Sequence, residues 1–334
     1  MKFSFLQPGR DPEPDGWEDF RRGHDLTAIW SYDVIRASFE RSWARPLLCV
    51  VHESGRIVGA VGAIRFGRGP LVLDVRLPAH SNGPTWCLPG GAEGRELIRG
   101  FERAAAAEFG WRLAGVVYRM VTEAALPLVA RAGALVRQSP GTTQLPVRWP
   151  ARDGWIATLS RNRRSTLRRQ IRRIEEDGTL TVVEGNGRTD LDPAELARLH
   201  ERHAARLTAP TTPRGWVAAA LDRRLPLTAA YFAELIRRDD VRTVSYHEGD
   251  RLLAFAVVYD HPTTPMYGPW AALPAEEGGR KDLYFDSYVR IIAHATAGRA
   301  ERLFAGRGFV DVKRSLGFDY LPMRLVAVPR WAIG

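Results

Sequence analysis

One pattern occurs twice in the chain and constrains its fold more than any other feature. The stretches 48–66 and 243–261 each contain an apolar run, a His-Glu pair, a tight polar turn, an arginine and a second apolar run. Two apolar runs joined by Ser-Gly or Gly-Asp predict a β-hairpin. His52 of the first copy and His247 of the second are 195 positions apart. The sequence therefore predicts the duplication of a domain-sized unit rather than a short-period repeat.

Each half of the chain repeats the same order of elements around its hairpin. A helix precedes the hairpin, and a strand, a glycine-containing loop, a second helix and further strands follow it. Gly90-Gly91 and Gly278-Gly279 both lie just before that second helix. Proline and polar residues between 141 and 153 mark a boundary. We therefore expect two α/β domains, residues 1–150 and 151–334, each with a mixed sheet flanked by helices.

The composition narrows the class of protein. Hydrophobic residues make up 45% of the chain, no apolar run approaches membrane-spanning length, and the first residues lack the apolar segment of a signal peptide. We expect a soluble, cytoplasmic protein, as a monomer or dimer. The net charge of +10 favours acidic partners such as nucleic acid or phosphates, although a general bias toward arginine would also produce it.

An arginine-rich helix is predicted at the start of the second half. Ser160 is a typical N-cap residue, and Leu167, Ile171 and Ile174 share one helical face. Arginines cover the rest of the helix and suit contacts with RNA phosphates and 2′-hydroxyls. The alternative is a solvated helix face, or pairing with the acidic residues that follow. The candidate RNA contacts are Arg161, Arg164, Arg168, Arg169 and Arg172.

A resemblance follows from these features. The repeated order, the arginine-rich helix and the terminal pattern Phe309, Lys313, Gly317, Phe318 resemble the Fem-type aminoacyl-transferases, which are tandem GNAT-fold proteins. They also resemble relatives described as BioF2-like or cellulose-biosynthesis acetyltransferases. The resemblance covers nearly the whole chain and implies a tandem duplicated GNAT fold and acyltransferase activity. It also implies that two strands separate near 267–270 and 304–308, where a backbone amide polarises the acyl carbonyl.

The resemblance implies that Lys313 holds the donor or stabilises charge during transfer. The chain has only three lysines among 48 basic residues, so a lysine here suggests that a compact point charge is needed. The alternative is a solvated surface lysine. Tyr267 and Tyr284 are the tyrosines expected to expose a hydroxyl as a proton relay. The first half has no counterpart of Lys313, so we expect catalysis in the second half and a structural or acceptor-binding role for the first.

The loop before the second helix of the second half bears on the identity of the donor. GNAT enzymes that use coenzyme A hold its pyrophosphate with a Q/R-x-x-G-x-G/A loop at a helix start. Residues 276–281, EEGGRK, fit that pattern poorly, and two carboxylates would repel a pyrophosphate. The segment 208–216 is expected to be mobile, and His203 or Arg206 beside it is a candidate for lining the acceptor site. The residues expected to bind donor or substrate are Arg280, Lys281, Arg307, His203, Arg206 and Trp270.

Three functions remain open at this point. The leading one is transfer of an aminoacyl group from aminoacyl-tRNA to the amine of a small-molecule or peptide acceptor, which forms an amide without a cofactor. The alternative is transfer from acetyl- or acyl-coenzyme A by the same fold. The third is a non-catalytic RNA-binding protein on a degenerate transferase fold. We expect no metal, because His200 and His203 on one helix have no third ligand in the sequence.

Overall fold

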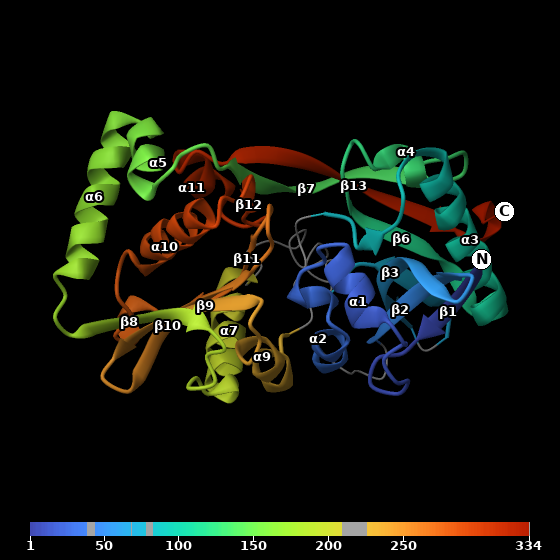
Figure 1. The fold of residues 1–334 in the computed structure, drawn as a ribbon, viewed down its shortest axis with the longest axis horizontal. Helices are drawn as coiled ribbons and strands as arrows, with labels where there is room; N and C mark the ends of the chain where they lie inside the picture. Colours follow the sequence, from blue (N-terminus) through green and yellow to red (C-terminus); the bar gives the residue numbers. More distant parts are fainter. Residues whose placement is uncertain (39–43, 68, 78–82, 209–225, 334) are drawn as a thin grey trace. The chain divides into compact units, whose positions relative to one another are not determined.

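The structure, a computed structural model, describes residues 1–38, 44–67, 69–77, 83–208 and 226–333 (Figure 1). The chain forms two compact units, and each takes in more than one stretch of sequence. Unit 1 comprises Met1–Gln144, Gly306–Val310 and Asp319–Gly334, and unit 2 comprises Leu145–Ala305 and Asp311–Phe318. The sequence-based division assigns 319–334 to the second domain, whereas in the structure this stretch is part of unit 1.

Unit 1 is a mixed sheet with helices. Its strands follow the order β1-β2-β3-β4-β6-β13-β7, and β5 pairs with β3. β4 and β6 run parallel, and the other neighbours run antiparallel. The strands are β1 (Lys2–Leu6), β2 (Ala44–Glu53), β3 (Arg56–Phe66), β4 (Leu71–Val75), β5 (Trp86–Cys87), β6 (Leu113–Val121), β7 (Leu135–Pro146) and β13 (Asp319–Pro329). The helices are α1 (Trp17–Gly23), α2 (Tyr32–Ala37), α3 (Gly91–Phe109) and α4 (Leu126–Val129), with 3₁₀ turns η1 (Ala28–Trp30), η2 (Gly110–Arg112) and η4 (Arg330–Ala332).

The first predicted hairpin is present as β2 and β3. Leu48 pairs with Gly62, and the strands are joined at Ser54 and Gly55. Both turn residues have positive φ, 49° and 81°, as a two-residue type I′ turn requires. One face of the hairpin packs against the apolar side of α3 and forms the core of unit 1. That core includes Leu47, Cys49, Val61, Ala63, Ile98, Phe101 and Ala105.

The last strand of the chain, β13, belongs to the sheet of unit 1. It pairs with β6, where Pro329 lies opposite Gly115, and on its other side with β7, where Asp319 lies opposite Gln144. Val326 and Val328 are buried in the core of unit 1. The apolar pattern of this strand indicates burial but not its neighbours, because any sheet with a free edge would accept it.

Unit 2 repeats the layout around the second hairpin. Its strands follow the order β12-β11-β10-β9-β8, with β11 and β12 parallel and the others antiparallel. The strands are β8 (Leu180–Asn186), β9 (Val241–Glu248), β10 (Arg251–Tyr259), β11 (Met266–Ala272) and β12 (Arg302–Phe304). The helices are α5 (Arg152–Thr158), α6 (Arg161–Glu175), α7 (Pro193–Thr208), α9 (Ala229–Ile236), α10 (Leu283–Ala297) and α11 (Val310–Ser315), with the 3₁₀ turn η3 (Ala275–Glu277).

The predicted arginine-rich helix is α6. Its Ser160 cap accepts a hydrogen bond from the amide of Arg163 at 3.3 Å. Leu167, Ile171 and Ile174 are buried in the core of unit 2, as their spacing predicts. This burial holds α6 beside α10 (Figure 1). The second hairpin, β9 and β10, turns at Gly249 and is buried in the same core through both strands.

Part of one prediction falls outside the described chain. Of the segment 208–216, which the sequence predicts to be mobile, residues 209–216 lie outside the described residues. Among the residues that are described, no helix has the length and apolar character needed to cross a membrane.

Candidate active site

The parallel strands of the two units differ in how far they pair. In unit 1, β4 and β6 pair from Leu71 opposite Leu113 to Val75 opposite Tyr118. In unit 2, within the described residues, β11 and β12 share one register pair, Met266 with Phe304, and beyond it β11 continues beside β10. The strand separation implied by the GNAT resemblance therefore occurs in unit 2, and it begins at residue 267.

A β-bulge in β11 lies at this separation. Ala256 of β10 pairs with Trp270 and Val258 pairs with Tyr267, so Gly268 and Pro269 together face one residue of β10. A β-carbon at position 268 would lie 2.6 Å from the ring of Tyr259, so the close approach requires glycine. Proline has no N–H, which leaves the amides of Gly268 and Trp270 as the donors at the bulge.

Lys313 is buried within unit 2. Its side chain on α11 is 3% exposed, and Nζ donates a hydrogen bond to the carbonyl oxygen of Ala305, directly after β12. Burial lowers the pKa of Lys313 to about 7, because removal from water disfavours the ammonium. The alternative of a solvated surface lysine is wrong. A lysine with this pKa is present in both protonation states near neutral pH.

The residues after Lys313 fix its helix in place. The amide of Phe318 donates to the carbonyl of Lys313 at 3.1 Å, and the amide of Gly317 donates to Arg314 at 2.9 Å. This is a Schellman ending, and Gly317 has the positive φ, 87°, that it requires. The indole of Trp155 donates to the carbonyl of Leu316 at 2.9 Å. The Gly-Phe element of the terminal pattern is therefore the cap that orients Lys313.

The two candidate tyrosines belong to a buried aromatic cluster. Tyr267 stacks on Tyr288 with ring centroids 4.8 Å apart, and its hydroxyl lies 2.9 Å from that of Ser287. The hydroxyl of Tyr284 lies 3.3 Å from that of Tyr288. Burial raises the pKa of Tyr284 to about 12 and that of Tyr267 well above its usual range. The expected exposure of Tyr267 is therefore wrong, since the side chain is 6% exposed. Both tyrosines remain neutral hydrogen-bonding groups near pH 7.

A charged group that the sequence did not reveal lies next to this cluster. Asp286 of α10 is 4% exposed, and it accepts hydrogen bonds from the hydroxyl of Tyr246 at 2.9 Å and from Nε of Arg290 at 2.7 Å. The Arg290 interaction has the i, i+4 spacing that a sequence can show. Tyr246 and Asp286 are 40 positions apart, so only the fold brings them together.

The predicted donor-binding residues before α10 contact other side chains. Arg280 forms ion pairs with Glu248 and, at 3.4 Å, with Asp177, while Lys281 is exposed. Glu248 is the acidic member of the second His-Glu pair. The recurrence of that pair in the sequence did not indicate this contact with Arg280. A phosphate at Arg280 would have to displace these carboxylates, so only Lys281 is readily accessible to an anion.

The N-terminus of α10 itself carries a carboxylate. Asp282 directly precedes the helix and has a positive φ of 72°. Its side chain accepts a hydrogen bond from Gln170 at 2.8 Å and forms an ion pair with Arg173, and both of these residues lie on α6. The carboxylate makes no hydrogen bond to the amides of the first turn of α10, and it places a negative charge beside the positive end of the helix dipole. A pyrophosphate bound at this helix start would lie close to that negative charge.

Three other predicted substrate-binding residues lie at or near β11. Nη2 of Arg206 on α7 donates to the carbonyl of Ala272 at 2.6 Å and lies 3.2 Å from Nδ1 of His203. Burial lowers the pKa of His203, which keeps its ring neutral near pH 7. Trp270 packs against Tyr284 with ring centroids 5.4 Å apart. These three residues therefore line one strand of unit 2.

Two further predictions concern Arg307 and a metal site. Arg307 is half-buried and belongs to unit 1, so it is not grouped with the residues of unit 2 above. No group of three or more His, Cys, Asp or Glu side chains that could hold a metal is found among the described residues. Burial lowers the pKa of His200 to about 4, and its ring packs edge-on against Phe232.

The arginines of α6 divide into two sets. Arg161, Arg168, Arg169 and Arg172 are exposed, and no ion pair with a described carboxylate is recorded for any of them. Arg164 is half-buried and donates to the carbonyl of Ala157 at 2.7 Å. Arg163, which the sequence did not single out, stacks over the ring of Phe285 at 4.2 Å. Four of the five predicted RNA contacts are thus available at the surface.

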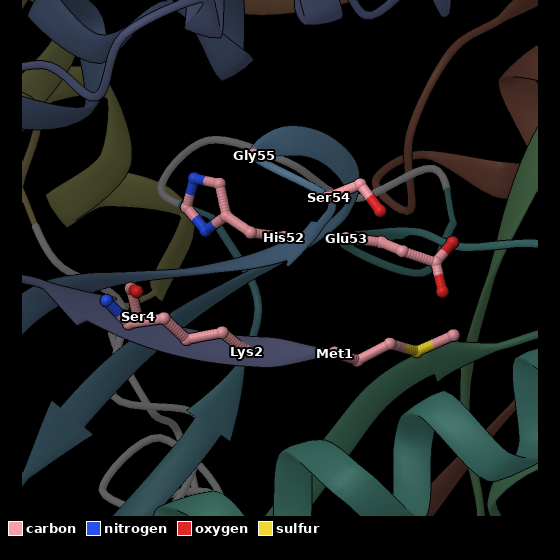
Figure 2. A pocket seen from close by; sticks show the side chains of 7 residues that line it. All are labelled: Met1, Lys2, Ser4, His52, Glu53, Ser54 and Gly55. Atoms are coloured by element: carbon pink, nitrogen blue, oxygen red, sulfur yellow. The ribbon is translucent and has the colours of Figure 1, made fainter.

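A separate hollow of about 460 Å³ lies in unit 1. It is formed by the start of β1 and the turn of the first hairpin (Figure 2). The side chains that line it include no predicted site residue. They are Met1, Lys2, Ser4, His52, Glu53, Ser54 and Gly55.

The sequence of the second half matches a known domain. Residues 161–314 match the model of an acetyltransferase (GNAT) domain, and this range includes α6, the bulge in β11 and Lys313. The chain therefore carries a GNAT acyltransferase domain and is a transferase. No curated protein sequence matches the chain.

Solved structures confirm the fold of the whole chain. L-PGS from Bacillus licheniformis is 11% identical, with a TM-score of 0.60 and coverage of 95% of this chain and 92% of that one. FemX is 10% identical, with a TM-score of 0.57 and coverage of 98% and 97%. The C-terminal DUF2156 domain of a protein named as a lysylphosphatidylglycerol synthetase from Agrobacterium fabrum is 14% identical, with a TM-score of 0.54 and coverage of 89% and 86%. The predicted tandem GNAT fold and the resemblance to Fem-type proteins are confirmed.

Proposed function

We propose that this protein transfers an aminoacyl group from aminoacyl-tRNA to the amine of a small-molecule or peptide acceptor. The product is an amide, the tRNA is a co-substrate, and no cofactor takes part. The catalytic centre in this proposal is the part of unit 2 where β11 leaves β12, with Lys313 as its central residue.

The observation that carries the choice of donor is the ion pair between Asp282 and Arg173. A coenzyme A donor needs an N-terminus of α10 that accepts a pyrophosphate. Asp282 places a carboxylate beside that N-terminus, and Gln170 and Arg173 of α6 hold it in position. A pyrophosphate beside this carboxylate would be repelled. An aminoacyl-tRNA donor has no such requirement.

Lys313 has the properties that amide formation needs. The acceptor amine attacks the ester carbonyl of the aminoacyl-tRNA, the carbon–oxygen bond to the ribose breaks, and the ribose oxygen takes up the proton that the amine gives up. The pKa of about 7 lets Lys313 donate a proton to the leaving oxygen in one form and accept one from the amine in the other. Tyr267 and Tyr284, as neutral phenols, are the proposed links for that proton.

The bulge in β11 supports the proposal as the oxyanion-stabilising element. Of the residues in the bulge, Gly268 and the neighbouring Trp270 retain an amide N–H. A backbone N–H aimed at the acyl oxygen stabilises the negative charge that develops in the tetrahedral intermediate. The bulge interrupts the ladder to β10, which is how a strand makes an amide available for this role.

The exposed arginines of α6 are the proposed contact with the tRNA. Arg161, Arg168 and Arg172 are spaced seven and four residues apart, so they lie along one side of the helix, adjacent to the face that buries Leu167 and Ile171. Such a stripe follows the phosphates of an RNA strand. Lys281, Arg280, His203, Arg206 and Arg307 remain proposed contacts for donor or acceptor.

Acyl-coenzyme A is the second candidate donor, because the domain model that matches residues 161–314 is that of an acetyltransferase. One experiment separates the candidates. The full chain is incubated with charged tRNA or with acyl-coenzyme A and a panel of amines, with and without RNase, and acylated products are identified by mass. The proposal expects product with charged tRNA only, and RNase should abolish it. Product with the thioester only would refute it, and RNA binding without product would favour a non-catalytic RNA-binding protein.

A further inference from the structure

A second group of arginines lies in unit 1, far in sequence from α6. Arg45 of β2 and Arg65 of β3 are directly opposite each other in the antiparallel register. Like charges at facing positions of two strands destabilise a sheet. Arg10, four residues after β1, and Arg112, just before β6, act on Arg65 electrostatically as well. Two facing strands and the segments next to β1 and β6 therefore bring four positive charges close together in unit 1.

The surroundings of these four arginines make their mutual repulsion more destabilising. Arg45 and Arg65 are half-buried, and burial together with the three neighbouring arginines lowers the pKa of Arg65. Nε of Arg45 is buried and has no hydrogen-bond acceptor among the residues that the structure describes. No ion pair of Arg10, Arg45 or Arg65 with a described carboxylate is recorded. The free protein thus holds repelling, partly desolvated guanidinium groups that an anion would neutralise.

The topology explains why these residues meet. Arg45 and Arg65 continue the face of the hairpin that carries Leu47 and Ala63 into the core, since alternate residues of a strand share a face. Helix α3 covers that face and ends at Phe109, and η2 leads directly from it to Arg112 and β6. The arginines therefore emerge where α3 ends. One cation would suffice there to complement the helix dipole, so the other charges call for a different partner.

We propose that Arg45 and Arg65, flanked by Arg10 and Arg112, form a binding site for the phosphate group of a ligand. Adjacent guanidinium groups present paired N–H donors that match phosphate oxygens in bidentate geometry. The phosphate belongs to an RNA strand or to a small phosphorylated molecule, since both present the same oxygens. The site uses residues of unit 1 alone, so it does not depend on the proposed transfer in unit 2.

The test is calorimetric titration of the full chain with pyrophosphate. Arg45→Gln and Arg65→Gln should each weaken pyrophosphate binding about tenfold or more, because each removes a charged hydrogen-bond donor. Arg95→Gln, at the exposed opposite end of α3, is the matched control and should bind as the wild type does. Without ligand, Arg65→Gln should raise the melting temperature, because it removes like-charge repulsion. Arg112→Gln, at an exposed position, provides a variant that does not disturb the hairpin.

Competition identifies the source of the phosphate. If a short single-stranded RNA displaces pyrophosphate from the wild type, the ligand is RNA. If RNA binds without displacing it, the ligand is a small phosphorylated molecule. Wild-type affinity for pyrophosphate in Arg45→Gln and Arg65→Gln would overturn the proposal, as would an equal loss in Arg95→Gln. A failure of aminoacyl transfer would leave these binding results unchanged.

Discussion

Nζ of Lys313 donates a hydrogen bond to the carbonyl oxygen of Ala305, one residue after the end of β12. The bond joins the short helix α11 to the strand that separates from β11 in unit 2. It gives the buried amine a polar acceptor, so the side chain is held where the two parallel strands part. The position and the lowered pKa of Lys313 make it the residue on which the proposed chemistry depends.

Replacement of Lys313 by methionine tests its role directly. Methionine keeps the length and apolar stem of the side chain but removes the proton, so we expect the rate of transfer to fall about 10²-fold or more. The variant should fold, because an apolar side chain suits a buried position. Transfer rate and melting temperature are measured together. Lys2→Met is the matched control, since Lys2 is exposed in unit 1, and it should retain full activity. Normal transfer by Lys313→Met would remove this residue from the mechanism.

The pKa of Lys313 predicts how stability changes with pH. Burial lowers this pKa from 10.5 to about 7, so the unfolded chain binds the proton more tightly than the folded one does. The unfolded state therefore holds more protons between these two values, and the free energy of unfolding should rise with pH across that range. The burial penalty is fully present below about pH 7. Denaturant unfolding of the wild type and Lys313→Met should show this rise only in the wild type, and parallel pH curves would contradict the assignment.

The exposed arginines of α6 predict a salt-dependent affinity for tRNA. In the double variant Arg168→Gln, Arg172→Gln, the slope of log affinity against log salt should become shallower by about 2, because each lost phosphate contact contributes about 0.9. The core-facing residues of α6 are untouched, so the fold should persist. Arg95→Gln, exposed on a helix of unit 1, should leave the slope unchanged. An unchanged slope in the double variant would mean that tRNA binds elsewhere.

Replacement of Gly268 by alanine tests whether the β-bulge in β11 contributes to stability and transfer. In Gly268→Ala the new β-carbon would lie 2.6 Å from the ring of Tyr259, so we expect a loss of about 1–3 kcal/mol in the free energy of unfolding. The rate of transfer should fall as well, because the bulge amides would move. Gly178→Ala is the control, since nothing lies within 4 Å of a β-carbon there, and its effect should stay within about 0.5 kcal/mol. Equal stability of the two variants would show that the ring of Tyr259 moves freely.

Much of the fold could be predicted from the sequence because its signals are local. The two hairpins follow from alternation of apolar residues and from turns at Ser54-Gly55 and Gly249-Asp250. The buried face of α6 follows from the spacing of Leu167, Ile171 and Ile174. Turn chemistry and helical or strand periodicity act over a few residues, so they are visible without the rest of the molecule.

The candidate site could be predicted only in part. The position of Lys313 follows from the terminal pattern, whereas its burial does not, because charged residues are buried only when the surrounding packing provides for them. Tyr267 shows the same limit, since the sequence pointed to an exposed hydroxyl and the fold buries it. The contacts of Asp282 with α6 and of Asp286 with Tyr246 join residues far apart in sequence, so no local pattern announces them.

By itself, the sequence determined that the chain is duplicated, that each half contains a hairpin and later helices, and that the basic charge of the second half gathers on α6. Only the tertiary structure decided that β13 pairs with β6 and β7, that β11 leaves β12 after Met266, and that Arg45 faces Arg65. The reason is physical. Local conformation depends on neighbouring residues, whereas strand partners, burial and charge clusters depend on which surfaces the folded chain brings together.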